Sequence, residues 1–200
     1  MPPLLLAVIA VAGAYIIGSL DFAVVVGRMH GVDIHSVGSG NPGTANVMRT
    51  LGRGPAAMVL VGDMLKGVVA AALGMVVSGD PQSALAVGAG LAADVGHCYP
   101  LFHRFRGGEG VATAVGVVLL VVPLGGLVLA GIWLLVVAIT RISALGSLAL
   151  SLAAVPVVMW QGVKGMALVP LALIFLLVIV RHRTNIQRLL AGEEHSVTRN

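Results

Sequence analysis

Long apolar runs separated by short polar segments dominate the sequence. The runs cover residues 3–27, 56–77, 82–101, 110–122, 124–140, 142–160 and 165–180. A helix of roughly 20 apolar residues crosses the hydrocarbon core of a bilayer, and most of these runs approach that length. The pattern therefore predicts an all-α integral membrane protein, a seven-transmembrane-helix bundle that forms a single domain over residues 1–200.

The segment 110–140 admits two interpretations. As one helix, its roughly 30 residues would measure about 45 Å at about 1.5 Å per residue, well beyond a hydrocarbon core of about 30 Å. Pro123, followed by Gly125 and Gly126, offers a place for the chain to turn. We therefore predict two spans joined by a tight turn at Pro123.

The basic residues support seven spans and orient them. With seven spans, ten of the 12 lysines and arginines fall on one side of the membrane, Lys164 falls on the other, and Lys66 lies within a span. Fusing the fourth and fifth runs would divide them six against five. Because basic residues accumulate in cytoplasmic loops, we expect the N-terminus outside and the C-terminus in the cytoplasm. The ten are Arg28, Arg49, Arg53, Arg104, Arg106, Arg141, Arg181, Arg183, Arg188 and Arg199.

Composition narrows the class of protein further. Apolar residues make up 58% of the chain, charged residues only 10%, and the mean hydropathy is +1.03, values that the surface of a soluble domain would not tolerate. The net charge of +4 does not indicate a nucleic-acid partner, because the basic residues are scattered through short loops. The single cysteine, Cys98, excludes an internal disulfide and a cysteine-only metal cluster. No basic residue precedes the first run, which argues against a cleaved signal peptide.

The first long polar segment, residues 28–55, is rich in glycine and in hydrogen-bonding side chains. Closely spaced glycines let backbone N–H groups converge on an anion, and Arg49 adds a fixed positive charge. The segment is a candidate phosphate cradle, and the alternative is a flexible connector. Its candidate binding residues are Gly38, Ser39, Gly40, Asn41, Thr44, Asn46 and Arg49.

A second candidate cradle opens directly into the fourth span. The N–H groups and the dipole at a helix N-terminus favour a bound anion, and two arginines stand beside the glycines here. The alternative is an interfacial anchor, with the arginines facing lipid headgroups and Phe105 in the aromatic belt. The candidate binding residues are Arg104, Arg106, Gly107, Gly108, Glu109 and Gly110.

Charged and polar residues inside or just past the apolar runs give a third signal. Asp63 and Lys66 are three residues apart, so they share a helix face and are expected to pair. His97 ends the third run, and His182 and Asn185 follow the last one. Intramembrane charges usually have a function, although structural pairs that orient the loops are an equal alternative. All these groups fall on one predicted side, as a shared site at the cytoplasmic face requires.

Three motifs combine these residues with their neighbours. They are Gly38-Ser39-Gly40-Asn41 through Asn46 to Arg49, Gly96-His97 through Tyr99-Pro100 to Gly107-Gly108, and Arg181-His182-Arg183 through Asn185 to Gly192-Glu193. The stretch from Asp63 to Gly67 and Ser147 fit the same pattern. Together they resemble, over nearly the whole chain, the bacterial acyl-phosphate:glycerol-3-phosphate acyltransferases of the inner membrane.

The resemblance implies an enzyme of phospholipid biosynthesis. Such an enzyme moves a fatty acyl group from acyl phosphate to the 1-hydroxyl of glycerol 3-phosphate and yields lysophosphatidic acid and phosphate. The implied partners are these substrates and membrane lipid, and no metal, cofactor or nucleic acid is implied. Carried over by position, the catalytic residues are Ser39, Arg49, Ser147, His182 and Asn185, with Asp63, Lys66 and His97 in support.

The resemblance also suggests roles for these residues. Arg49 and the loop N–H groups would hold the phosphates, and Ser39, Ser147 and Asn185 would donate hydrogen bonds that fix the substrates. An acyl phosphate is already activated, so no protein nucleophile is needed. The hydroxyl proton can pass either to a phosphate oxygen or to His182.

Two positions depart from the family pattern. The family reads Gly-Gly-Lys-Gly where this sequence has Glu109. At about 4 Å and an effective dielectric near 20, each unit of charge is worth roughly 4 kcal/mol before solvent relaxation. Activity therefore depends on another positive charge that replaces the family's lysine, and Arg53, Arg104 and Arg106 are candidates to supply it. In the first loop, Thr44-Ala45 stands where the family reads Ala-Thr, which moves a hydroxyl by one residue.

Three functions remain open at this point. The chain is a working acyltransferase, a homologue whose activity is lost or altered because of Glu109, or a small-solute membrane transporter. A transporter usually places its binding groups near the bilayer midplane and often shows inverted repeats. Neither feature is found in this sequence, so the acyltransferase is the favoured interpretation.

Overall fold

The structure is a computed structural model that describes residues 1–197. Within this range it contains helices and no strand, as the apolar pattern predicts. Arg199, one of the ten arginines used to orient the chain, lies outside the described residues. The helices are α1 (Pro3–Gly18), α2 (Phe22–Met29), α3 (Thr44–Leu51), α4 (Arg53–Ser78), α5 (Ala84–Cys98), η1 (Leu101–His103), α6 (Val111–Val121), α7 (Pro123–Thr140), α8 (Ser143–Trp160), η2 (Gly165–Ala167), α9 (Leu168–Arg181) and α10 (Arg183–Ala191).

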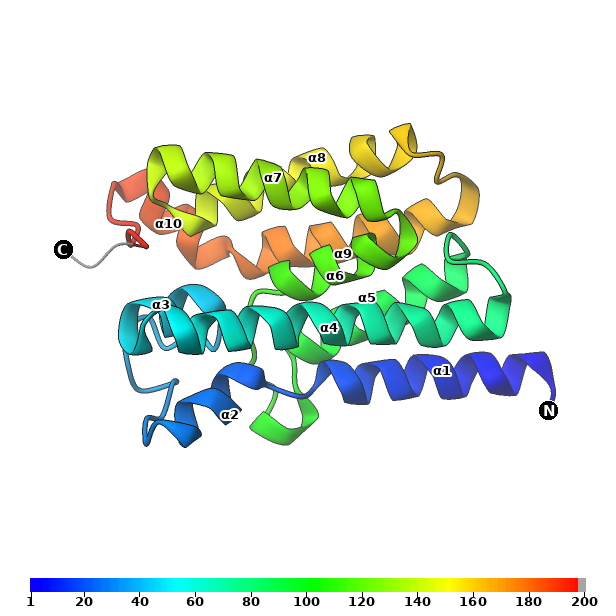
Figure 1. Cartoon of the computed structure of the whole chain (residues 1–200), viewed down its shortest axis with the longest axis horizontal. Coiled ribbons are helices and arrows are strands. Elements are labelled where there is room, and N and C mark those ends of the chain that lie inside the picture. Colours follow the sequence, from blue (N-terminus) through cyan, green and yellow to red (C-terminus); the bar gives the residue numbers. More distant parts are fainter. Residues whose placement is uncertain (198–200) are drawn as a thin grey trace.

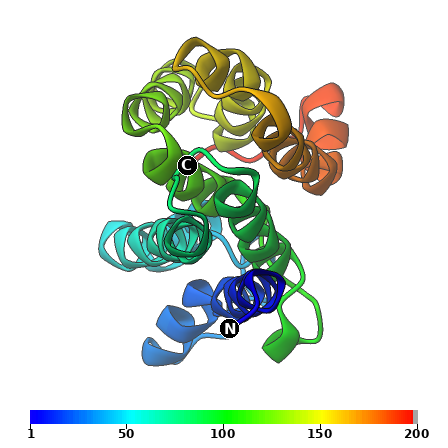
Figure 2. The same cartoon turned by 90° about the vertical axis from the view of Figure 1, so that its right-hand side faces the viewer.

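The longer helices pack side by side along one axis (Figure 1). Helices α1, α4, α5, α6, α7, α8 and α9 run alternately in the two directions, so the start of α1 lies at the opposite end of the molecule from α3 and α10. Viewed along that axis, α1 lies towards one edge of the bundle and α7 and α8 towards the other (Figure 2). The arrangement brings the segments after α1, before α4 and after α9 to the same end.

Small residues let neighbouring helices approach closely. A side chain at Gly18 of α1 would strike the backbone of Ala93 in α5. One at Gly67 of α4 would strike the carbonyl of Thr113 in α6. Helices inside a membrane gain stability from such close backbone packing, because the hydrophobic effect does not drive them together in lipid. These glycines therefore fix the two helix pairs, α1 with α5 and α4 with α6.

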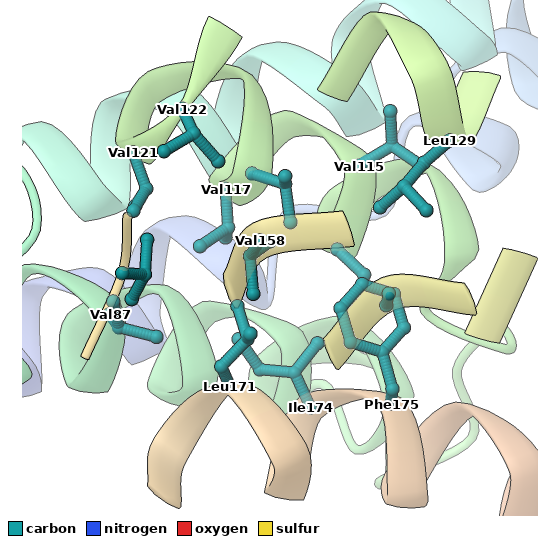
Figure 3. Close-up of a cluster of buried hydrophobic side chains, with 14 of the residues drawn as sticks. Val87, Val115, Val117, Val121, Val122, Leu129, Val158, Leu171, Ile174 and Phe175 are labelled. Carbon is teal, nitrogen blue, oxygen red and sulfur yellow. The ribbon is translucent and has the colours of Figure 1, made fainter. Parts of the chain in front are cut away.

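The main apolar core lies between α5, α6, α7, α8 and α9 (Figure 3). Val117, Val158 and Ile174 are completely buried there. Other large apolar side chains point away from the bundle, and Val76 and Ile139 are 76% and 74% exposed. An apolar outer surface of this extent is suited to lipid and not to water.

Within residues 1–197, four helical segments are long and apolar enough to cross a membrane: Pro3–Met29, Arg53–Ser78, Pro123–Thr140 and Ser143–Trp160. A fifth is counted when Gly165–Arg181 and Arg183–Ala191, which meet at a bend of 49°, are taken as one broken span. Helix α6 is apolar but has only 11 residues. An all-α architecture with several apolar helices is thus established. That seven of the helices cross the membrane stays a prediction.

The predicted turn at Pro123 is confirmed. Helix α6 ends at Val121 and α7 begins at Pro123. A side chain at Gly126 would lie 2.8 Å from the Cα of Leu119, whereas residues seven apart in a continuous helix are separated by about 10 Å along its axis. The chain therefore reverses here, and proline, which lacks an N–H group, is tolerated because it occupies the first position of α7.

Two other predicted segments differ in detail. The run 3–27 is divided, because Asp21 caps α2 and accepts a hydrogen bond from the backbone N of Val24 at 3.0 Å. Because Leu20 and Phe22 on either side of Asp21 are apolar, the hydropathy pattern shows no break at this cap. The predicted loop 28–55 contains the eight-residue helix α3, and two of the residues of this helix, Asn46 and Val47, are buried.

Candidate active site

A cavity of about 410 Å³ opens where four parts of the chain meet. Its walls come from the polar segment before α4, from the loop before α6, from α9, α10 and the residues that follow, and from Ser143 at the start of α8. The predicted site residues in its wall are Ser39, Gly40, Asn41, Asn46, Arg49, Arg106, Gly107, Glu109 and Asn185. The other lining residues are His35, Pro42, Ala45, Phe105, Ser143, Arg181, Arg183, Thr184, Arg188 and Glu194. The two predicted cradles therefore belong to one site.

Asn46 shapes the first cradle from inside. Its amide Nδ2 donates to the backbone oxygens of Ile34 and Val37 at 3.3 and 3.0 Å, and its Oδ1 accepts from the backbone N of Ser39 at 2.9 Å. Gly38 turns with φ of +59°, and a side chain there would collide with Asn46. The amide of Asn46 thus replaces backbone partners that this irregular loop lacks and holds the loop in place, while a contact with substrate stays a prediction.

Arg49 projects from α3 into the cavity wall. Its Nη2 donates to the Ser39 hydroxyl at 3.4 Å. Burial lowers the pKa of the Arg49 guanidinium, while the carboxylates of Glu194 and Glu109 act in the opposite direction. Two residues of the first predicted cradle, Ser39 and Arg49, are therefore in contact, and the Arg49 guanidinium also lies near two carboxylates.

Arg181 clamps the second cradle. Its Nε donates to the carbonyl of Gly108 at 3.0 Å and its Nη2 to that of Gly107 at 2.8 Å. The guanidinium also lies over the Tyr99 ring, 5.1 Å from the centroid, in the range of a cation–π interaction. In the sequence analysis, Arg181 serves only as a basic residue that orients the chain and as part of the third motif. Its contact with Gly107 and Gly108 could not be foreseen, because residues more than 70 positions apart leave no local pattern in the sequence.

Glu109 stands between His182 and the cavity. His182 is completely buried, and its Nδ1 lies 2.8 Å from the carbonyl oxygen of Val178. Its Nε2 lies 3.3 Å from Glu109 Oε2 without forming a hydrogen bond. The Glu109 side chain is 24% exposed and lines the cavity, whereas His182 does not. The carboxylate of Glu109 therefore borders the cavity in front of the imidazole, and the catalytic role of His182 stays a prediction.

Glu194 was not predicted from the sequence and organises the third wall. Its carboxylate accepts from Arg188 Nε at 2.8 Å and from Asn185 Nδ2 at 3.1 Å. Because a carboxylate only accepts, the Asn185 amide is oriented with Nδ2 towards Glu194. Its Oδ1 is buried without a hydrogen-bond partner. The amide of Asn185 therefore donates within the cavity wall, and its role as a donor to a substrate stays a prediction.

The predicted pair of Asp63 and Lys66 is confirmed, with 2.8 Å between Asp63 Oδ1 and Lys66 Nζ. His97 extends it, because its Nδ1 lies 3.5 Å from the same oxygen. The other edge of the His97 ring packs on Gly108, where any side chain would collide with Nε2. The buried pair of Asp63 and Lys66 thus contacts the second cradle at Gly108 through the imidazole ring of His97.

Several predicted residues lie outside the cavity wall. The buried Ser147 hydroxyl donates to the carbonyl of Ser143 at 3.0 Å and accepts from Trp133 Nε1 at 3.2 Å, while Ser143, one turn earlier, lines the cavity. The direct substrate role of Ser147 stays a prediction. The other predicted site residues beyond the wall are Gly38, Thr44, Arg104, Gly108, Gly110 and His182, besides the supporting Asp63, Lys66 and His97.

Residues 1–197 contain no group of three or more histidine, cysteine or acidic side chains arranged to hold a metal ion. A second hollow, of about 510 Å³, lies on α1 and is lined by Ala7, Val8, Val11, Ala12 and Tyr15. It offers no charged group to a phosphate. The polar cavity, which is lined by charged side chains, is therefore the candidate site.

Comparison with known proteins identifies the family to which this chain belongs. The glycerol-3-phosphate acyltransferase family matches residues 8–192. The glycerol-3-phosphate acyltransferase of Hydrogenovibrio crunogenus is 46% identical over 188 residues, which cover 92% of this chain and 88% of the relative. That of Rubrobacter xylanophilus is 40% identical over 200 residues, with 95% and 94% covered.

Solved structures of PlsY (YgiH), an integral membrane glycerol 3-phosphate acyltransferase, have the same fold. The glycerol 3-phosphate form is 39% identical to this chain with a TM-score of 0.89, and the match covers 95% of this chain and 94% of that one. The lysophosphatidic acid form is 38% identical with a TM-score of 0.87 over the same shares. This chain belongs to the glycerol-3-phosphate acyltransferase family of integral membrane enzymes.

Proposed function

We propose that this protein transfers a fatty acyl group from acyl phosphate to the 1-hydroxyl of glycerol 3-phosphate, giving lysophosphatidic acid and phosphate. The observation that carries the proposal is the set of arginines in one cavity wall: Arg49, Arg106, Arg181, Arg183 and Arg188. Both substrates carry phosphate, which guanidinium groups bind through paired hydrogen bonds. The relatives solved in glycerol 3-phosphate and lysophosphatidic acid forms favour the same acceptor and product.

Arg49 is the residue best placed to hold a phosphate. Its contact with the Ser39 hydroxyl is long, at 3.4 Å, and a charged phosphate oxygen would replace it with a stronger hydrogen bond. Asn185, which lines the same cavity, would fix a hydroxyl of the glycerol, as the resemblance implies. The two residues would thus hold opposite ends of the acceptor substrate.

The wall also offers compensation for Glu109. Five arginines line it against two carboxylates, those of Glu109 and Glu194. Of the candidates named from the sequence, Arg106 lies in the wall, whereas Arg53 and Arg104 do not. This excess of positive charge favours a working enzyme over a homologue that has lost its activity.

The proposal includes a multi-pass arrangement in the bacterial cytoplasmic (inner) membrane, with seven spans, the N-terminus outside and the C-terminus and the site in the cytoplasm. The alternating helices and the placement of α3 and α10 opposite the start of α1 (Figure 1) support it. Single cysteines introduced at positions 1 and 200 into a Cys98→Ala background should be labelled by an impermeant reagent from opposite sides. Labelling of both from one side would contradict the odd number of spans.

Phosphate release by the purified protein tests the reaction. Acyl phosphate should be consumed with glycerol 3-phosphate and much more slowly without it, and Glu109→Lys, which restores the family's residue, runs in parallel. Turnover by the native chain would establish that neighbouring arginines compensate for Glu109. Turnover by Glu109→Lys alone would identify a homologue with altered activity, and turnover by neither would reject the acyltransferase proposal.

A further inference from the structure

The segment before α6 divides into two halves with different surroundings. In the second half, Gly107 and Gly108 are buried, and Arg181 holds their carbonyl oxygens. The first half, residues 101–106, contains η1 and leaves the bundle: its green turn projects beside the junction of α1 and α2 (Figure 1) and stands clear of α1 when viewed along the axis (Figure 2). The sequence leaves two functions open for this segment, an anion cradle and an interfacial anchor. The structure separates them, with the glycines in the cradle and the projecting half free for another role.

The projecting half combines exposed apolar side chains with an exposed cation. Leu101, Phe102 and Phe105 are 50%, 57% and 56% exposed, and Arg104 is exposed as well. No acidic residue occurs between positions 99 and 106 to neutralise the positive charge. Large apolar groups are unfavourable in water, whereas a guanidinium is unfavourable in hydrocarbon. The boundary between lipid headgroups and acyl chains suits both kinds of group.

A hydrogen bond to the end of α1 sets the depth of this turn. The backbone N of Leu101 donates to the hydroxyl of Ser19 at 3.3 Å, and Ser19 directly follows α1. The helical segment Pro3–Met29 is long and apolar enough to cross a membrane. Because about 20 residues cross the hydrocarbon core, this core ends close to Ser19. Leu20 is 48% exposed, so the apolar exterior of α1 continues to the turn.

The turn has a fixed shape. Arg104 and Phe105 have φ of +53° and +59°, values that residues other than glycine seldom adopt. Two backbone hydrogen bonds hold the turn, from Phe105 N to the carbonyl of Pro100 at 3.0 Å and from Arg106 N to that of His103 at 3.1 Å. The exposed side chains therefore extend from a preformed surface.

We propose that Leu101, Phe102, Arg104 and Phe105 form a binding surface for anionic phospholipid in the leaflet on the cavity side of the membrane. The apolar side chains lie among the acyl chains, and the Arg104 guanidinium binds the headgroup phosphate through charge-assisted hydrogen bonds. The uncompensated positive charge selects anionic over zwitterionic headgroups. Lipid binding at this surface does not depend on the proposed acyl transfer, although Phe105 also lines the cavity.

Fluorescence quenching in lipid vesicles tests where the surface lies. An environment-sensitive dye is attached to Phe102→Cys in a Cys98→Ala background, and Leu101→Cys provides an independent copy. The control is Glu193→Cys, which labels an exposed position in the tail. Lipids with a nitroxide near the headgroup should quench the dye at position 102 strongly, and aqueous iodide should quench it several times less than the dye at position 193.

The same labelled protein reports headgroup preference. Nitroxide-labelled phosphatidylglycerol and nitroxide-labelled phosphatidylcholine are compared at equal fractions in phosphatidylcholine vesicles. We expect the anionic lipid to be enriched about fivefold around the dye, the effect of roughly one basic residue near an anionic surface. The enrichment should fall in about 1 M salt, where the Debye length is only about 3 Å.

Two matched variants assign this preference. Arg104→Gln should remove most of it, because the exposed guanidinium next to the apolar side chains is lost. Lys164→Gln removes the same charge from an exposed residue at the opposite end of the bundle and should leave the preference unchanged. Both residues lie outside the cavity wall.

Equal quenching by iodide at positions 102 and 193 would overturn the proposal, because the turn would then lie in water. A dye that neither iodide nor the lipid nitroxide reaches would also overturn it, since protein, such as a second copy of the chain, would then cover the surface. Equal quenching by the two lipids, or a preference that survives Arg104→Gln, would reject the recognition of anionic headgroups.

Discussion

The buried pair of Asp63 and Lys66 allows a stability prediction to be worked out in detail. The two side chains are 3% and 2% exposed and 2.8 Å apart, and Lys66 also donates to the carbonyl of Leu20 at 2.9 Å. Replacing Asp63 by leucine leaves the ammonium group inside the bundle without its counter-charge. Removing one partner of a buried ion pair typically costs about 3–5 kcal/mol, and we expect Asp63→Leu to lower the free energy of unfolding by that amount.

The double variant Asp63→Leu, Lys66→Met provides the decisive comparison. It removes both charges, so the cost of an uncompensated ion disappears. What remains is the loss of partners by His97 and by the carbonyl of Leu20, each worth about 0.5–1.5 kcal/mol as an ordinary hydrogen bond. The double variant should therefore be less stable than the native protein by about 1–3 kcal/mol, and more stable than Asp63→Leu.

Denaturant unfolding in detergent micelles, followed by tryptophan fluorescence, measures these differences through the shift of the transition midpoint. The native protein, both single variants and the double variant form a complete cycle, which isolates the coupling between the two side chains. A double variant as unstable as Asp63→Leu, or less stable still, would refute the view that the counter-charge is what stabilises this part of the bundle.

Three further changes test the site. Arg49→Ala should lower acyl transfer at least a hundredfold in the phosphate-release assay while its thermal unfolding stays near native, and full activity would remove the first cradle from the mechanism. Arg181→Lys loses the paired hydrogen bonds to the second cradle and should lower kcat/KM about 10- to 100-fold, since one of these charge-assisted bonds is worth roughly 1.5–3 kcal/mol; native kcat/KM would show that the clamp is dispensable. Gly108→Ala should inactivate the enzyme because its methyl group would strike His97, whereas Gly88→Ala, which meets no atom within 4 Å, should be silent; equal activity of the two would contradict the close packing.

Features that depend on local spacing could be predicted from the sequence. Asp63 and Lys66 pair because residues three apart share a helix face, and Pro123 marks a reversal because proline starts a helix better than it continues one. The convergence of Ser39, Arg49 and Asn185 on one cavity followed from their predicted position on one side of the membrane, together with the family resemblance.

Features that depend on how individual side chains are oriented could not be predicted. Glu194 lies in a polar tail whose composition gives no sign that it orients Asn185. Nothing in the sequence shows that Glu109 shields His182 from the cavity. The hydroxyl of Ser147 turns to Ser143 and Trp133, because a serine inside a helix can bond to the carbonyl four residues earlier.

The central claim is that the arginine-lined cavity catalyses acyl transfer to glycerol 3-phosphate. The most direct test supplies radiolabelled glycerol 3-phosphate and acyl phosphate to the purified protein in lipid vesicles and measures labelled lysophosphatidic acid together with free phosphate. We predict that the two products form in equal amounts and that Arg49→Ala forms both at least a hundredfold more slowly. Phosphate released without labelled lipid, or lipid formed equally well by Arg49→Ala, would contradict the claim.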